Sequence, residues 1–236
     1  FDASGLFEGT VAIYGGAPTE WVFRPPSARA KPFTACGPFA LRIGYLQGDP
    51  KESRLSADDY AATSGKLRRI SGLYVYRDGI RVLPYGSVDV DYLGIEERRS
   101  LNAGRYVFSY RRMFGAVEIS KETNPDLRDK ASREGLMNNQ AYRDMRDLLR
   151  ELLVGLAADF FRAGGEHSSD YLDEKGRLRE ADLLRRQQSK ALLDRLSEFK
   201  RILEDSLEKL SSGQVRADAE QVVAGVQAAL HNAGGD

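Results

Sequence analysis

The sequence predicts an α+β protein with a mostly antiparallel sheet, followed by a long helical C-terminal extension. Over the first 120 residues, apolar side chains alternate in short runs that glycine and proline interrupt, which is typical of strands. After Asn138 the apolar residues recur every three or four positions, which is typical of helices. We therefore expect an α+β domain over residues 1–165 and a helical extension over residues 166–236.

The first two expected strands cover residues 6–14 and 39–46. Leu6, Phe7, Val11 and Ile13 alternate loosely in the first strand, and a Gly-Gly-Ala-Pro turn follows it. Residues 21–37 contain three prolines, which exclude helix, so we expect irregular structure there. The second strand places Leu41, Ile43 and Tyr45 on one side.

A helix and a hairpin follow. The Ser56 hydroxyl is placed to cap a helix that ends near Arg69, and Asp59 completes the cap three residues later. Asp78-Gly79 between two β-branched and aromatic runs predicts a hairpin of residues 73–76 and 80–83. Further strands are expected at residues 106–110 and 114–120.

Three helices are expected in the second half. The first begins near Asn138 and ends at Gly164-Gly165, and residues 166–176 are polar and loop-like. The second covers residues 178–210 and the third 215–230. In the second helix, apolar side chains alternate spacings of four and three: Leu192, Leu196, Phe199 and Leu203. Such a helix is either a dimer seam or the cover of a sheet.

Composition limits the class of protein. Lys plus Arg equal Asp plus Glu at 35 each, so no overall field attracts nucleic acid or an anionic membrane. One cysteine, Cys36, excludes an internal disulfide and fits a reducing compartment, so we expect a cytoplasmic location. No apolar run approaches the roughly 20 residues that span a bilayer, and we expect no membrane contact. Because the chain starts at Phe1 rather than Met, we expect a fragment.

The usual catalytic groups are scarce. The two histidines, His167 and His231, share no metal-ligand spacing with Cys36, so we expect no metal site. Cys36 between Ala35 and Gly37 is expected to be a small buried apolar residue rather than a nucleophile. Asp89 and Asp91 are a possible carboxylate pair, but the alternation around them favours a solvated strand edge.

Five arginines lie close together in a stretch without acids, and aromatic residues Tyr106, Phe108 and Tyr110 alternate with part of it. This pattern permits contact with a nucleic-acid backbone and stacking on bases. It equally fits a sheet with a solvated arginine face, and neutral net charge removes the usual electrostatic footprint. The five are Arg98, Arg99, Arg105, Arg111 and Arg112.

Arg133 lies in Ser132-Arg133-Glu134-Gly135-Leu136, between a loop and the helix that begins near Asn138. It either pairs with local carboxylates or reaches toward a phosphate, for which its planar, permanently charged guanidinium is suited. We favour the second interpretation, with the phosphate bound by a domain outside this chain.

Several stretches resemble a known superfamily. Leu73-Tyr74-Val75-Tyr76-Arg77 and Ser132-Arg133-Glu134 are similar to the middle domain of the ninety-kilodalton heat-shock chaperones. With residues 34–39, 72–86 and 133–136, they resemble bacterial chaperone-like ATP-binding proteins of the gyrase, chaperone, histidine-kinase and MutL superfamily. The resemblance covers about residues 1–165.

The resemblance implies a transducer domain with a ribosomal-protein-like βαβ core. Its basic side chain, which maps onto Arg133, approaches the γ-phosphate of ATP bound with Mg in a missing N-terminal domain of the same protein. The chaperone loop carries a Gln four residues beyond its Arg, where this chain has Met137; Asn138 and Asn139 are the candidates to replace it. A homodimer is a possible partner, and so is nucleic acid, as in the MORC-like branch.

Overall fold

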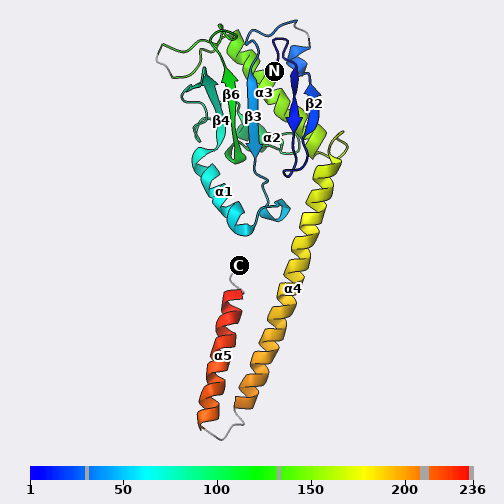
Figure 1. The fold of residues 1–236 in the computed structure, drawn as a ribbon, viewed down its shortest axis with the longest axis vertical. Helices are drawn as coiled ribbons and strands as arrows, with labels where there is room; N and C mark the ends of the chain where they lie inside the picture. Colours follow the sequence, from blue (N-terminus) through cyan, green and yellow to red (C-terminus); the bar gives the residue numbers. More distant parts are fainter. Residues whose placement is uncertain (30–31, 132–133, 208–212, 234–236) are drawn as a thin grey trace. The chain divides into compact units, whose positions relative to one another are not determined.

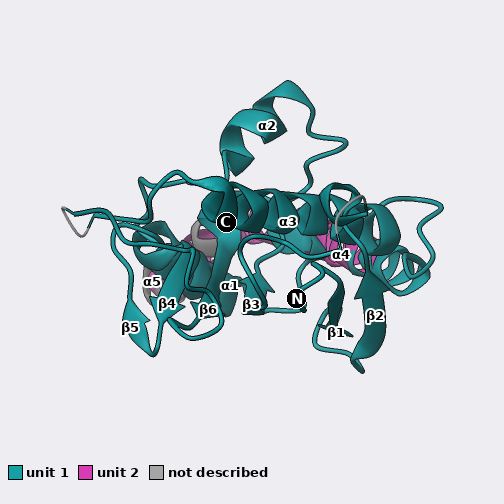
Figure 2. Ribbon diagram, turned by 90° about the horizontal axis from the view of Figure 1, so that it is seen from above, with its two compact units in different colours: residues 1–178 teal, residues 179–236 magenta. Residues whose placement is uncertain are grey.

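A computed structural model describes residues 1–29, 32–131, 134–207 and 213–233. The chain divides into two compact units, Phe1–Leu178 and Arg179–Asp236 (Figure 2). Unit 1 contains all the described strands, and the described residues of unit 2 are helical. The chain is therefore α+β, as the residue pattern predicts.

The first sheet of unit 1 is an antiparallel pair. Strand β1 covers Phe7–Val11 and β2 covers Thr19–Phe23, with Gly9 opposite Trp21. The first predicted strand is confirmed in a shorter form. The expectation of irregular structure from residue 21 is wrong for β2, because Trp21 is buried against α3 and its extension while the prolines follow the strand.

The second sheet has four strands, in the order β3-β6-β4-β5, and Figure 1 shows β3, β6 and β4 side by side. They are β3 (Ala40–Tyr45), β4 (Gly72–Arg77), β5 (Ile80–Arg81) and β6 (Met113–Ile119). The pairs β3–β6 and β4–β5 are antiparallel, whereas β4 and β6 are parallel. The second predicted strand and the last are confirmed, and the sheet is mixed.

The hairpin between β4 and β5 is confirmed. Asp78 and Gly79 have φ angles of 51° and 79°, both left-handed, as a tight two-residue hairpin turn requires. Two neighbouring predictions are wrong. Residues 106–109 have no strand pairing, because Phe108 is buried as part of the core, and Tyr110 begins a short 3-10 helix. Asp91 is not on a strand edge, since its carboxylate accepts a hydrogen bond from the Glu96 amide in a turn.

Helices complete unit 1. Helix α1 covers Ala57–Ile70, and Ser56 caps it by accepting from the Asp59 amide, as predicted. Helix α2 covers Ile95–Leu101. Helix α3 covers Gln140–Leu156, confirming the first long helix, and continues as a π-helical turn. Its buried face, which covers one side of both sheets (Figure 2), carries Met145, Leu148, Leu149 and Leu152.

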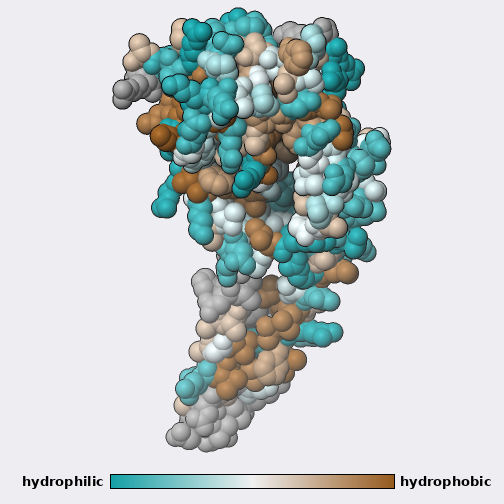
Figure 3. Space-filling model, turned by 45° about the horizontal axis from the view of Figure 1, so that its top comes forward, coloured by the Kyte–Doolittle hydropathy of each residue, from teal (hydrophilic) through white to brown (hydrophobic). Residues whose placement is uncertain are grey.

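Helix α4 covers Ser169–Leu207 and α5 covers Gly213–Ala233, so both later helices exist. The expected loop at residues 166–176 is wrong from Ser169 onward, where α4 already begins. The polar residues there include no proline that would break a helix. In the expected seam, Leu192 and Phe199 are exposed, whereas Leu196 and Leu203 are half-buried. Exposed apolar side chains of unit 2 are visible as brown atoms in Figure 3. Cys36 is fully buried, as predicted.

Candidate functional site

The loop that precedes α3, residues 126–139, is the candidate site, and we call it the entry loop. A backbone bridge pairs Asp129 with Leu136 in antiparallel fashion. Within this pairing, the Lys130 amide donates to the Gly135 carbonyl at 2.9 Å, and the Met137 amide donates to the Arg128 carbonyl at 2.7 Å. The loop is therefore a narrow hairpin with a closed base.

The tip of the entry loop faces solvent at both of its described flanks. Ala131 and Glu134 are exposed on either side of the tip. Ser132 and Arg133, the predicted phosphate contact, lie outside the described residues. The contact of Arg133 with a phosphate therefore stays a prediction.

Arg77, at the end of β4, holds the base of the entry loop. Its Nη1 donates to the Asp129 carboxylate at 2.6 Å, and its Nη2 donates to the Leu127 carbonyl. The Arg77 side chain is only 14% exposed, whereas that of Asp129 is 49% exposed. A guanidinium fixed at two points by a charged and a neutral acceptor restrains the loop more firmly than a surface ion pair.

Tyr85 supports the other strand of the loop. Its hydroxyl accepts a hydrogen bond of 2.9 Å from the Leu136 amide, and both residues are buried. Burial raises the pKa of the Tyr85 phenol, and the Leu136 N–H opposes that rise. Gly135 has φ +91°, and a Cβ there would lie 3.1 Å from the Tyr85 hydroxyl, so the loop requires glycine at this position.

Asn138 and Asn139, predicted to contact a cofactor, lie where the entry loop joins α3. Asn139 is the N-cap: its Oδ1 accepts from the Tyr142 amide at 3.0 Å, and its Nδ2 donates to the Asp126 carbonyl at 2.6 Å. Asn138 is exposed, and its carbonyl accepts from Arg143. Asn139 therefore has structural partners, and a role of either residue toward a ligand stays a prediction.

Four of the five arginines of the predicted nucleic-acid surface lie on two short helices, and the fifth, Arg105, lies between them. Arg98 and Arg99 are half-buried on α2, and Arg111 and the half-buried Arg112 belong to the 3-10 helix Tyr110–Arg112. Arg105 is exposed, with its guanidinium 5.7 Å from the ring centre of Tyr106.

An acid just outside this stretch faces part of it. Although burial opposes ionisation of Glu96, the Ser109 hydroxyl at 2.6 Å, the Arg111 amide and the charge of Arg99 hold its pKa below the usual value. Glu96 therefore places a negative charge beside this arginine stretch, although the stretch itself contains no acid.

Two further arginines near this surface were missed. Burial lowers the pKa of Arg150, and the charges of Arg146 and Arg98 lower it further, so these cations are close together. The Arg150 Nε donates to the Leu93 carbonyl at 2.6 Å. The four-residue spacing of Arg146 and Arg150 on a helix was the available sequence signal, because such residues share a face.

Unit 1 also has two large cavities, of about 1230 and 540 Å³. None of the described residues of the entry loop lines either cavity. Among the described residues, no group of three or more His, Cys, Asp or Glu side chains could hold a metal ion. No helix in the same part of the chain could cross a membrane.

Comparison of the chain with protein-family models, with curated proteins and with solved structures found no match. The superfamily resemblance of residues 1–165 stays a prediction from the motifs.

Proposed function

We propose that this chain is a transducer-type domain of a chaperone-like ATPase of the gyrase, chaperone, histidine-kinase and MutL superfamily. The entry loop presents Arg133 to the γ-phosphate of ATP bound with Mg in another domain of the same protein. Unit 2 then relays the closure of the two domains to a partner or a dimer mate. The supporting observation is a loop with a firmly anchored base and exposed flanks at its tip.

The anchoring matters because a side chain that stabilises developing charge must be positioned before the reaction. Arg77, Tyr85 and Asn139 each hold a different part of the loop base, so the backbone there is ordered before the loop meets an anion. One well-placed arginine contributes about 10³–10⁵ in the rate of phosphoryl transfer.

The test uses the longer polypeptide in which this chain is joined to its nucleotide-binding domain. Arg133→Ala should lower ATP hydrolysis by about 10³-fold while ATP binding changes little. Arg133→Lys should restore only part of the rate, since an ammonium lacks the guanidinium fork. Arg128→Ala is the control, because Arg128 is an exposed arginine at the loop base, 3.7 Å from Asp126.

An Arg133→Ala protein that hydrolyses ATP at the unaltered rate would remove the role of Arg133. A longer polypeptide that neither binds ATP nor changes its protease resistance with ATP would remove the whole proposal. Both measurements are needed, since binding and closure can occur without turnover.

A nucleic-acid-binding module is the second candidate, and it is favoured by Arg98 and Arg150, which line one small cavity together with Tyr106. Affinity should fall steeply with salt, because phosphate contacts release counterions. Arg105 and Arg111 are exposed, so a double alanine variant of these two should weaken binding without unfolding the protein. A gel shift without affinity at low salt contradicts this candidate.

A further inference from the structure

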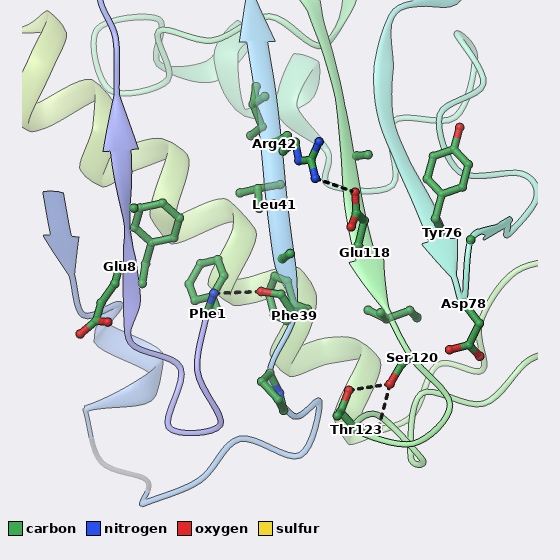
Figure 4. A pocket seen from close by; sticks show the side chains of 18 of the residues that line it. Phe1, Glu8, Phe39, Leu41, Arg42, Tyr76, Asp78, Glu118, Ser120 and Thr123 are labelled. Atoms are coloured by element: carbon green, nitrogen blue, oxygen red, sulfur yellow. Dashed lines mark hydrogen bonds and ion pairs between the residues drawn. The ribbon is translucent and has the colours of Figure 1, made fainter. Parts of the chain in front are cut away.

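Two strand edges in unit 1 face each other without pairing. Strand β1 is paired on one side with β2, and β3 on one side with β6. No backbone hydrogen bond joins β1 to β3 in the described part of the chain. Residues of both strands line each of the two large cavities, and the larger cavity also extends over residues of β4 and β6. We call the space between β1 and β3 the strand slot (Figure 4).

Phe1 occupies one end of the strand slot and defines its width. The Phe1 nitrogen donates to the Phe39 carbonyl at 2.9 Å, and the Phe39 amide donates to the Phe1 carbonyl at 3.1 Å. Residues that exchange both bonds form an antiparallel hydrogen-bonded pair. On the opposite side, the Asp2 amide donates to the Leu6 carbonyl at 2.9 Å, next to β1. One extended chain therefore spans the two edges at this end.

The directions of the strands agree with this geometry. The arrows of β1 and β3 point the same way in Figure 4. Residues added before Phe1 would extend its antiparallel pairing with Phe39 and so run antiparallel to β3. Because the chain reverses at residues 2–6 before it enters β1, the same residues would also run antiparallel to β1. One strand can therefore pair with both edges at once.

The register follows from the existing pairs. The Phe1 ring contacts the rings of Phe7 and Phe39, whose centroids are 5.3 and 4.7 Å away, so the three side chains share one face. The position before Phe1 then lies opposite Glu8 and Ala40 on the outer face. The position before that lies opposite Gly9 and Leu41 on the inner face, and successive positions alternate.

The two faces of the strand slot differ in polarity. The inner side of the smaller cavity is lined by Leu152, Leu153 and Leu156 of α3, together with Ile43. The outer rim carries the exposed Glu8 and Arg42, whose side chain is 82% exposed and lies 3.7 Å from Glu118. An occupant therefore needs alternating apolar and polar side chains.

We propose that the strand slot takes one extended polypeptide strand joined to the Phe1 amino group, antiparallel to both β1 and β3. The strand is apolar opposite Gly9–Leu41 and Val11–Ile43, and polar between them. It joins the two sheets of unit 1 into one continuous sheet. This pairing follows the main-chain rules of strand addition and is independent of the entry loop and of nucleotide.

The experiment adds a short extension before Phe1 of the 236-residue chain. The matched extension Val-Thr-Val-Thr places its valines on the inner face. The control Thr-Val-Thr-Val has the same composition but places them outside, because a one-residue shift turns every side chain over. Amide hydrogen exchange is measured at Leu41 and Ile43 of β3 and at Glu8 and Thr10 of β1. These are the alternate residues whose backbone N–H and C=O groups point into the strand slot.

The matched extension should slow exchange at these amides by about tenfold or more, because several backbone hydrogen bonds form together. The control extension should leave exchange unchanged. Equal protection by both extensions, or by neither, overturns the proposal. Protection that depends on protein concentration and accompanies a dimer in size-exclusion chromatography also overturns it, since a second copy then supplies the strand.

Discussion

Replacing Tyr85 with Phe tests whether the hydroxyl under the entry loop holds its base. The substitution keeps the ring, which packs edge-on against Tyr92 with centroids 4.8 Å apart. It removes the acceptor of the Leu136 amide, and Leu136 is only 1% exposed. An unsatisfied buried donor costs about 1–3 kcal/mol. For a unit of this size, each kcal/mol lowers the melting temperature by roughly 2–4 °C.

The assay is urea unfolding followed by the fluorescence of Trp21, the single tryptophan, which is buried in unit 1. Tyr74→Phe is the matched control, because the Tyr74 hydroxyl donates to the Ile70 carbonyl at 3.0 Å in an exposed setting. Its cost should stay within about 0.5 kcal/mol. The Leu136 amide should also exchange faster in the Tyr85 variant. Equal unfolding midpoints for the two variants would refute the role assigned to Tyr85.

Three other substitutions test the fold around the site. Asn139→Ala should lower the free energy of unfolding by about 0.5–2 kcal/mol in urea, whereas Asn139→Asp keeps the helix cap and loses only the bond to Asp126. Asp159→Leu removes the acceptor of the Trp21 indole N–H, 3.0 Å away, and should cost about 1–3 kcal/mol, with Asp159→Asn the milder control. Burial raises the pKa of Tyr14 to about 12, so the unfolded chain releases this proton first as pH rises above 10. Stability should fall between pH 10 and 12, and Tyr14→Phe should reduce that fall; an identical pH profile in the variant would contradict it.

Local signals predicted the elements whose side chains satisfy local rules. Asp78-Gly79 predicted its hairpin because the turn requires left-handed φ angles, and Ser56 predicted the start of α1 because its hydroxyl caps the helix. The alternation of Leu41 and Ile43 predicted β3 because one face of that strand packs inward. These signals depend on neighbours in sequence, so a single chain reveals them.

The errors arose where tertiary contacts override local pattern. Trp21 belongs to a strand that neighbouring prolines obscured, because its indole packs against Phe160 and donates to Asp159 far along the chain. Phe108 alternates with other aromatics, yet it packs edge-on to Tyr45 and Phe161 without strand pairing. At the candidate site, motifs singled out the loop around Arg133, but spacing could not show that Arg77 and Tyr85 hold its base.

The central position of β6 has a consequence for synthesis. This strand lies between β3 and β4, yet it is the last of the four to leave the ribosome. A nascent chain that stops before Met113 carries two strands whose shared neighbour does not yet exist, and closing that gap joins residues far apart in sequence. Until β6 emerges, the unpaired edges are exposed to other chains, so chaperone demand and aggregation should be greatest for truncations that end just before it.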